Sequence, residues 1–261
     1  MLGDGNMSQI NVILENVKLP KVIKVSQKFE NIKLNDVEEN LYEKLIKKNL
    51  GKKIKEGSSI AITGGSRGIS CYTKLMKTIV DFVKEKGGIP FIVPAMGSHG
   101  GGNAIGQIKM LEKLGISEKN MGCKIISSME VVEIGKTSKN LPVYIDKKAY
   151  SADGIILLNR VKAHTSFRGE YESGLIKMIA IGLGKRKGAE STHSLRFENM
   201  AENILESGKL SLEHLNIIGG ICTIENAYDE VADIFVLNKD EILDKEPQLL
   251  EKSKELMPKI Y

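Results

Sequence analysis

Short apolar runs alternate along the chain with longer segments in which apolar residues recur at helical spacing. A short apolar run bounded by turn residues predicts a buried strand, and a 3.6-residue repeat predicts a helix with one buried face. We therefore expect strands at residues 11–14, 21–27, 59–63, 90–94, 124–126, 131–134, 141–145, 153–158, 215–218 and 234–237. Helices are expected at residues 36–48, 72–86, 103–114, 194–206 and 239–254.

The order of these elements predicts the fold class. The strand at 59–63 runs into a glycine turn, a helix and a second strand, and the strand at 90–94 begins a similar unit. Units of this kind join parallel strands through a right-handed crossover. We expect an α/β fold with a mostly parallel sheet and helices on both faces, a Rossmann-like three-layer sandwich. The 261 residues fit a single domain of this type.

Composition narrows the class of ligand and the compartment. The net charge is +5, and the lysines are scattered among acidic residues. This balance favours a small anionic ligand, such as a carboxylate or phosphate, over nucleic acid. The three cysteines form no C-x-x-C pair, which argues against a zinc ribbon or disulfide framework and favours a cytoplasmic location. The sequence contains no apolar run of the ~20 residues that a membrane helix needs, so we expect no membrane partner.

Three of the predicted strands end in polar or glycine-rich turns, at Gly64, Gly97 and Asn159. The carboxyl ends of parallel strands lie at one edge of a sheet, and open α/β sheets bind their ligands there. The segment 159–193 is also dense in basic residues and holds two of the four histidines in the chain. We therefore expect the three turns to form one pocket.

The turn at 64–68 reads Gly-Gly-Ser-Arg-Gly. Its backbone N–H groups can approach an anion, and Arg67 adds a forked donor, so Gly64, Gly65 and Ser66 are candidates for binding an anionic cofactor. Alternatively, the glycines serve only a tight turn that needs a positive φ. The segment matches neither the Walker pattern nor the G-x-G-x-x-G dinucleotide pattern.

Two histidines are candidates for general acid–base chemistry. His99 follows Ser98 and precedes three glycines, and an unperturbed histidine exchanges a proton near neutral pH. His164 follows Arg160 and Lys162, and nearby cations favour the neutral imidazole that accepts a proton. Alternatively, each histidine lies in a surface loop without a catalytic role, and the sequence pattern alone leaves both possibilities open.

Lys177 and His193 are the remaining candidates. Lys177 interrupts an apolar run, so it is either a surface residue with a buried stem or a buried amine kept for covalent chemistry. His193 precedes a predicted helix and is a candidate metal ligand, although one histidine is a weak metal signal. The histidines include no close-spaced pair such as H-x-x-x-H, so zinc hydrolysis is a poorer option. We interpret His214 as structural.

Taken together, these segments resemble the N-terminal lobe of the nickel-dependent lactate racemase family, in a branch separate from lactate racemase itself. The resemblance covers essentially the whole chain and is carried by SRG at 66–68, PAMGSHGG at 94–101, NRVKAHTSF at 159–167 and ESGLIKMIAIGLGKRKGAESTH at 172–193. It implies that residues 1–261 are a single α/β domain equivalent to one lobe of a two-lobed enzyme. A chain without the second lobe is expected to bind cofactor poorly and to turn nothing over by itself.

The resemblance also implies a cofactor and a role for each candidate residue. In that family, a nickel pincer nucleotide, a pyridinium mononucleotide with thioamide and thiocarboxylate groups, is attached to a lysine that Lys177 matches. Nickel is also bound by a histidine that His193 matches, while His99 and His164 match paired acid–base residues. Arg67 matches an arginine that holds the substrate carboxylate.

The expected function is therefore racemisation or epimerisation of a small 2-hydroxy acid by hydride transfer, with cofactor-synthesis enzymes as partners. Gly64 stands where the racemase has Asp, and the loop between His164 and Lys177 is longer and more charged, so the acid is lactate or a relative of it. The alternative is a non-catalytic anion- or nucleotide-binding module that needs Arg67, Arg160 and Lys162 but not His193.

Overall fold

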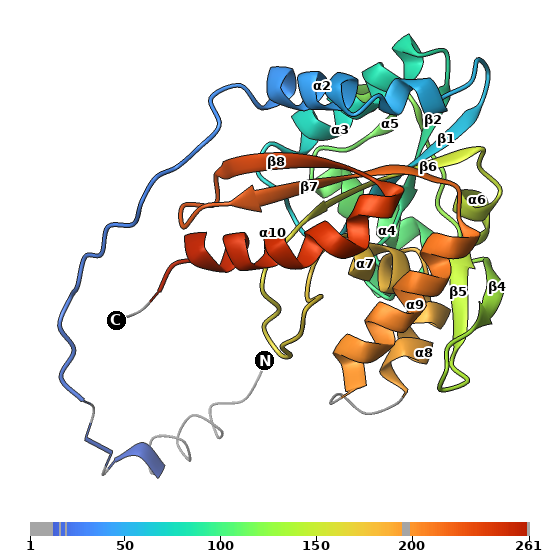
Figure 1. Ribbon diagram of the computed structural model, residues 1–261. Helices are drawn as coiled ribbons and strands as arrows, with labels where there is room; N and C mark the ends of the chain where they lie inside the picture. Colours follow the sequence, from blue (N-terminus) through green and yellow to red (C-terminus); the bar gives the residue numbers. More distant parts are fainter. Residues whose placement is uncertain (1–12, 16, 19, 195–198, 260–261) are drawn as a thin grey trace, which may run out of the picture.

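A six-stranded sheet organises the computed structural model, which describes residues 13–15, 17–18, 20–194 and 199–259 (Figure 1). Its strand order is β3-β2-β1-β6-β7-β8. Neighbouring strands from β3 to β7 are parallel, and β8 is antiparallel to β7. The strands are β1 Ser59–Gly64, β2 Ile89–Pro94, β3 Lys124–Ile125, β6 Gly154–Arg160, β7 Ile217–Glu225 and β8 Val231–Asn238.

Helices cover both faces of this sheet, which confirms the predicted α/β class and layering. One face carries α2 Val37–Lys47, α3 Tyr72–Glu85, α4 Ala104–Lys113 and α5 Glu118–Met121. The other carries α6 Lys147–Tyr150, α7 Leu175–Lys177, the π-helical turn η3 Met178–Gly182, α8 Lys185–His193, α9 Met200–His214 and α10 Ile242–Leu256. Short 3₁₀ turns are η1 Leu50–Lys53, η2 Gly100–Gly102 and η5 Lys239–Glu241.

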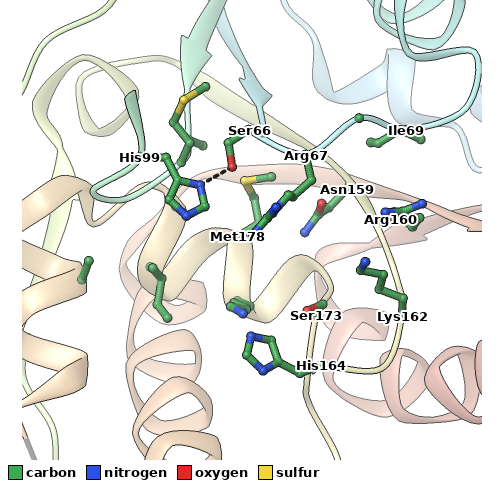
Figure 2. A pocket seen from close by; sticks show the side chains of 18 of the residues that line it. Ser66, Arg67, Ile69, His99, Asn159, Arg160, Lys162, His164, Ser173 and Met178 are labelled. Atoms are coloured by element: carbon green, nitrogen blue, oxygen red, sulfur yellow. Dashed lines mark hydrogen bonds between the residues drawn. The ribbon is translucent and has the colours of Figure 1, made fainter. Parts of the chain in front are cut away.

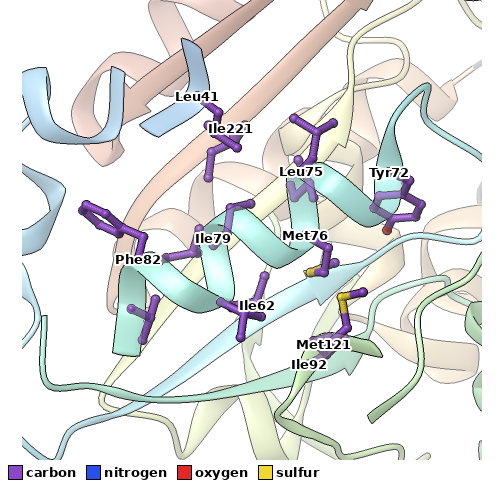
Figure 3. Close-up of a cluster of buried hydrophobic side chains, with 14 of the residues drawn as sticks. Leu41, Ile62, Tyr72, Leu75, Met76, Ile79, Phe82, Ile92, Met121 and Ile221 are labelled. Atoms are coloured by element: carbon purple, nitrogen blue, oxygen red, sulfur yellow. The ribbon is translucent and has the colours of Figure 1, made fainter. Parts of the chain in front are cut away.

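The α3 face shows how the sequence pattern produces this packing (Figure 3). Side chains alternate along β1, so Ile60 and Ile62 point to the α3 side while Ala61 belongs to the opposite cluster. Leu75 and Ile79 recur on one stripe of α3 and are fully buried there. Each such burial contributes about 1.5–3 kcal/mol, so this face holds β1 and β2 firmly in place.

Close packing on the other face depends on a glycine in β7, a strand that is buried along its whole length. A Cβ at Gly220 would lie 2.3 Å from Leu175 Cδ1, well inside van der Waals contact. The glycine therefore lets α7, the helix that carries Lys177, lie directly on the sheet.

A second, two-stranded sheet is formed by β4 Val131–Lys136 and β5 Pro142–Asp146. The sequence predicts both strands, and they pair with each other in antiparallel fashion rather than joining the main sheet. β5 contacts α8, so this hairpin supports the segment between Lys177 and His193 from outside.

Two predicted strands are wrong, and one predicted helix has other bounds. Residues 13–14 are helical and residues 21–27 form no strand, while residues 11–12 lie outside the described part. Apolar alternation makes 21–27 capable of pairing, but a strand needs a partner, and Val22, Ile23 and Val25 are 87–88% exposed. The helix expected at 194–206 corresponds to α9, which begins at Met200, with 195–198 outside the described residues. The helix α8, which ends at His193, was not predicted.

Within the described ranges, the helices are all too short or too polar to cross a lipid bilayer.

Candidate active site

The carboxyl ends of β1, β2 and β6 border a cavity of about 390 Å³ (Figure 2). Its wall combines the turns after these three strands with Ser173 and parts of the Lys177–His193 segment. The three glycine-rich or polar turns thus meet at one edge of the sheet, as the order of strands predicts.

The sequence candidates Gly65, Ser66, Arg67, His99, His164, Lys177 and His193 all line this cavity. Gly64 is not among the lining residues. It ends β1, and a Cβ there would lie 3.0 Å from Leu111 Cδ2, so its backbone packs against α4. Its role in cofactor binding stays a prediction.

His99 is held by its own loop and by Ser66. Its Nδ1 lies 2.5 Å from the Ser66 hydroxyl oxygen, and the buried Gln107 amide donates to the carbonyl oxygens of Gly97 and His99 at 2.9 and 3.3 Å. Burial lowers the pKa of His99, and the charges of Arg67 and Lys177 lower it further. The imidazole is therefore neutral at physiological pH and able to accept a proton.

His164 is fixed through its backbone. Its N–H donates to Glu172 Oε2 at 2.6 Å, and the other oxygen of this buried carboxylate pairs with Lys254 at 3.1 Å. The ring stacks on Phe167 with centroids 4.2 Å apart. Burial, followed by the charge of Lys177, lowers the pKa of His164 to about 4, so this imidazole is neutral as well.

Lys177 stands at the end of α7, and a buried carboxylate fixes the start of that helix. Glu246 Oε2, from α10, accepts from the N–H groups of Leu175 and Ile176 at 2.8 and 3.0 Å. The amine lies 5.5 Å above the Phe167 ring and, in the described part of the chain, has neither a hydrogen bond nor an ion pair. Burial, then Arg67 and Lys162, lowers its pKa to about 8, which makes it a nucleophile near neutral pH.

His193 is the last residue of α8 and is exposed at the cavity wall. The sequence placed it before a helix, and the structure corrects this. In the described ranges, no cluster of three or more His, Cys, Asp or Glu side chains is placed to hold a metal ion.

Sequence reasoning missed the groups that hold the site in place. Glu246 and Glu172 are buried acids whose oxygens bind backbone N–H groups beside Lys177 and His164. One signal was available: Glu246 falls on the inward stripe of α10 with Ile242, Leu249 and Leu250. A charged residue on an apolar stripe indicates a buried partner.

Comparison with known proteins identifies the family. The profile described as lactate racemase N-terminal domain matches residues 6–204. Among solved structures, the lactate racemase apoprotein from Thermoanaerobacterium thermosaccharolyticum matches with a TM-score of 0.61 and 13% identity, over 81% of this chain and 54% of that one. The chain thus spans about half the length of that racemase, and the likeness shows a shared fold. No curated protein sequence matches the chain. Because the profile covers most of its length, the chain belongs to the lactate racemase N-terminal domain family.

Proposed function

We propose that this chain provides the cofactor-bearing lobe of a racemase or epimerase that acts on a small 2-hydroxy acid. The observation that carries the proposal is that Arg67, His99, His164, Lys177 and His193 line one cavity. These residues come from three loops and two helices, so their convergence is not a consequence of sequence proximity. Family membership supports a racemase-related role.

The residues present fit a nickel pincer nucleotide. Lys177 offers an unpaired amine with a pKa of about 8, which suits covalent attachment. His193 offers one nitrogen at the cavity wall, and the absence of a larger ligand cluster in the described chain suits a metal whose other donors belong to the cofactor. When bound, this cofactor supplies an acceptor for the hydride at the carbon that bears the hydroxyl.

The protein groups then have separate tasks. Arg67 binds the substrate carboxylate through its forked donors and so orients the reacting carbon. His99 and His164 are both neutral, so each can take the hydroxyl proton and hold it on a ring nitrogen until it returns. Ser66 is bonded to His99 Nδ1, which leaves Nε2 of that ring for the proton.

The experiment is to produce the chain with a second lobe of the family, together with the cofactor-synthesis enzymes, and to measure nickel content and peptide masses. We expect about one nickel per chain and a mass adduct on Lys177 that Lys177→Arg abolishes. The exposed Lys187, in the same segment, provides the matched control, and Lys187→Arg should load normally. An unmodified Lys177 together with unbound nickel would contradict the proposal.

Two further variants separate acid–base residues from metal ligands. His99→Ala and His164→Ala should stop isomerisation while nickel stays bound, because neither histidine is proposed as a ligand. His193→Ala should release the metal. Loss of nickel in all three variants would show that the two acid–base assignments are wrong.

The second candidate is a non-catalytic module that binds an anion or nucleotide. It is favoured by one observation, the basic side chains of Arg67, Arg160 and Lys162 on the cavity wall. Nucleotide affinity that survives both Lys177→Ala and His193→Ala, with no isomerisation by the loaded wild type, would favour this function over the first.

A further inference from the structure

The charged side chains that line the cavity are all cationic. Arg67, Arg160, Lys162 and Lys177 belong to its wall, and the described lining includes neither Asp nor Glu. A site of this kind attracts anions.

The charge of Arg160 is neutralised within the protein. It forms an ion pair with Glu225, a buried carboxylate behind the wall. The other Glu225 oxygen accepts from the Ser70 N–H at 2.7 Å. Both oxygens of Glu225 thus have a partner within the protein, and its direct ion pair is with Arg160 rather than with Lys162.

The Lys162 ammonium group has no such ion-pair partner among the described residues. The backbone of Lys162 is fixed by a bridge to Ser173, with N–H to O distances of 2.9 Å and 3.2 Å in the two directions. Its ammonium group has no hydrogen bond with any residue in the described ranges either. Burial lowers the pKa of Lys162, the adjacent charges of Arg160 and Arg67 lower it further, and the more weakly acting carboxylates of Glu225 and Asp229 oppose the shift. A partly buried cation beside two guanidinium groups is unfavourable by itself, which points to a binding role.

Arg67 lies in the middle of the cavity wall, between an acid–base histidine and the unpaired lysine. Figure 2 shows it between His99 on one side and Lys162 on the other. Its charge lowers the pKa of both residues. A carboxylate on Arg67 therefore lies beside the acid–base residue His99, and a second anionic group on the same molecule can extend toward Lys162.

We propose that Lys162 and Arg67 form a site for two anionic groups, so that the substrate is a 2-hydroxy acid with a second acidic group. The inference rests on the proposed function, in which Lys177 loses its charge to the cofactor bond and Arg67 takes the carboxylate beside the reacting carbon. Lys162 then binds the second group, a distal carboxylate or phosphate. Lactate, with one carboxylate, leaves this lysine unpaired.

The test measures binding to the chain without cofactor, by calorimetric titration. The probes are 2-hydroxysuccinate, its 4-amide and lactate. The first two have nearly the same shape and differ in one charge. We expect 2-hydroxysuccinate to bind at least about tenfold more tightly than its 4-amide, because a charge-assisted bond to a partly desolvated ammonium is among the stronger hydrogen bonds.

Lys162→Gln should bring this ratio close to one and leave the affinity for the 4-amide unchanged. Lys187→Gln, at an exposed residue that does not line the cavity, should keep the wild-type ratio. Equal binding of the two probes by the wild type overturns the proposal. The proposal is also overturned if Lys162→Gln lowers the affinity for both probes equally. Lys162 and Arg67 would then bind the same carboxylate, which both probes carry.

The cofactor's own phosphate is the other source of an oxyanion. If Lys162→Gln lowers nickel retention in the loaded protein and leaves the probe ratio unchanged, Lys162 binds that phosphate and the proposal is wrong. Failure of this inference is separable from failure of the proposed function. An adduct on Lys177 without a dianion preference contradicts only the inference, whereas a dianion preference without any adduct contradicts only the function.

Discussion

Lys177 and Lys185 lie on one stretch of chain and are both withdrawn from water, yet their surroundings are opposite. The Lys185 ammonium is completely buried and meets Pro94 O at 2.5 Å, Gln107 Oε1 at 3.0 Å and Asp146 Oδ2 at 3.3 Å. Lys177 points into the cavity, where the described residues offer its amine no anionic partner. Burial lowers the pKa of both lysines, but Asp146 counteracts this at Lys185.

The difference distinguishes Lys185, whose charge stabilises the fold, from Lys177, whose amine is available for reaction. Lys185 connects the end of β2, the Gln107 amide that holds the His99 loop, and the end of β5. Removing one partner of a buried ion pair of this kind is strongly destabilising. Lys177 has no such role, and an unpaired amine beside other cations is the usual environment of a reactive lysine.

The largest expected effect is on stability. Lys185→Met leaves Asp146 buried and uncompensated, so we expect the free energy of unfolding to fall by about 3–5 kcal/mol. Lys177→Met removes only an unpaired charge and should change it by about 1 kcal/mol or less. Urea unfolding followed by circular dichroism measures both.

Two controls accompany that measurement. The double variant Lys185→Met/Asp146→Asn should recover more than half of the loss, because no charge remains buried and Asn keeps the oxygen that caps α6. Lys109→Met, on an exposed position of α4, should be nearly neutral. If Lys185→Met and Lys177→Met are equally destabilising, the two lysines do not differ as described.

A second prediction concerns the reactivity of the Lys177 amine. With a pKa of about 8, Lys177 should acylate with a midpoint near that pH, against about 10.4 for a lysine in water. At pH 7 the deprotonated fraction is then on the order of a hundredfold larger than for a free lysine. Trace acetylation with mass spectrometry of the folded chain measures this, and Lys185 should remain unlabelled.

Arg67→Gln sharpens the same measurement. Arg67 is one of the charges that lower the pKa of Lys177, so its removal should move the midpoint upward. A midpoint near 10 in the wild type would show that Lys177 is solvated rather than enclosed.

A third prediction concerns Glu246, the carboxylate that fixes the helix of Lys177. Burial raises its pKa from 4.5 to about 7, although the N–H groups of Leu175 and Ile176 oppose the shift. Between these values the folded state holds a proton that the unfolded state has released, so stability falls as pH rises through this window. At about 1.4 kcal/mol per pKa unit, the full loss is about 3 kcal/mol.

Glu246→Gln keeps the accepting oxygen and removes the titration. The stability of this variant relative to the wild type should therefore rise as the pH increases from 5 to 7.5. Urea unfolding of both proteins at the two pH values measures this difference. An unchanged difference between the two proteins across this range would mean that Glu246 does not titrate there.

The central part of the fold was predictable because its signals are local. The run at Ile60–Thr63, the glycine turn after it and the stripe of α3 specify strand, turn and helix within one short segment. The meeting of Arg67, His99, His164 and Lys177 followed from the rule that parallel strands share their carboxyl edge.

The failures arose where structure depends on distant partners. Residues 21–27 alternate as a strand does, but pairing is decided by other parts of the molecule. α8 reads KRKGAESTH and has no apolar stripe, so helical periodicity could not reveal it. It packs on η3 and β5, and at Gly184, the residue before α8, a Cβ would lie 2.7 Å from the Ala180 carbonyl oxygen. The anchors Glu172 and Glu246 likewise gain meaning only from the backbone groups that they meet.

The irregular turn between α7 and α8 has a consequence for how this family can vary. A continuous α-helix would carry His193 about 24 Å along its axis from Lys177 and turn it to another side. The π-helical turn at Met178–Gly182 and the left-handed residue Lys185 (φ 54°) fold the segment back, so that both residues reach one small cavity. Insertion or deletion of a single residue between them would rotate α8 by about 100° and separate the two groups. Natural variation in chain length is therefore expected in the loops outside this connection, while the connection itself keeps a fixed number of residues.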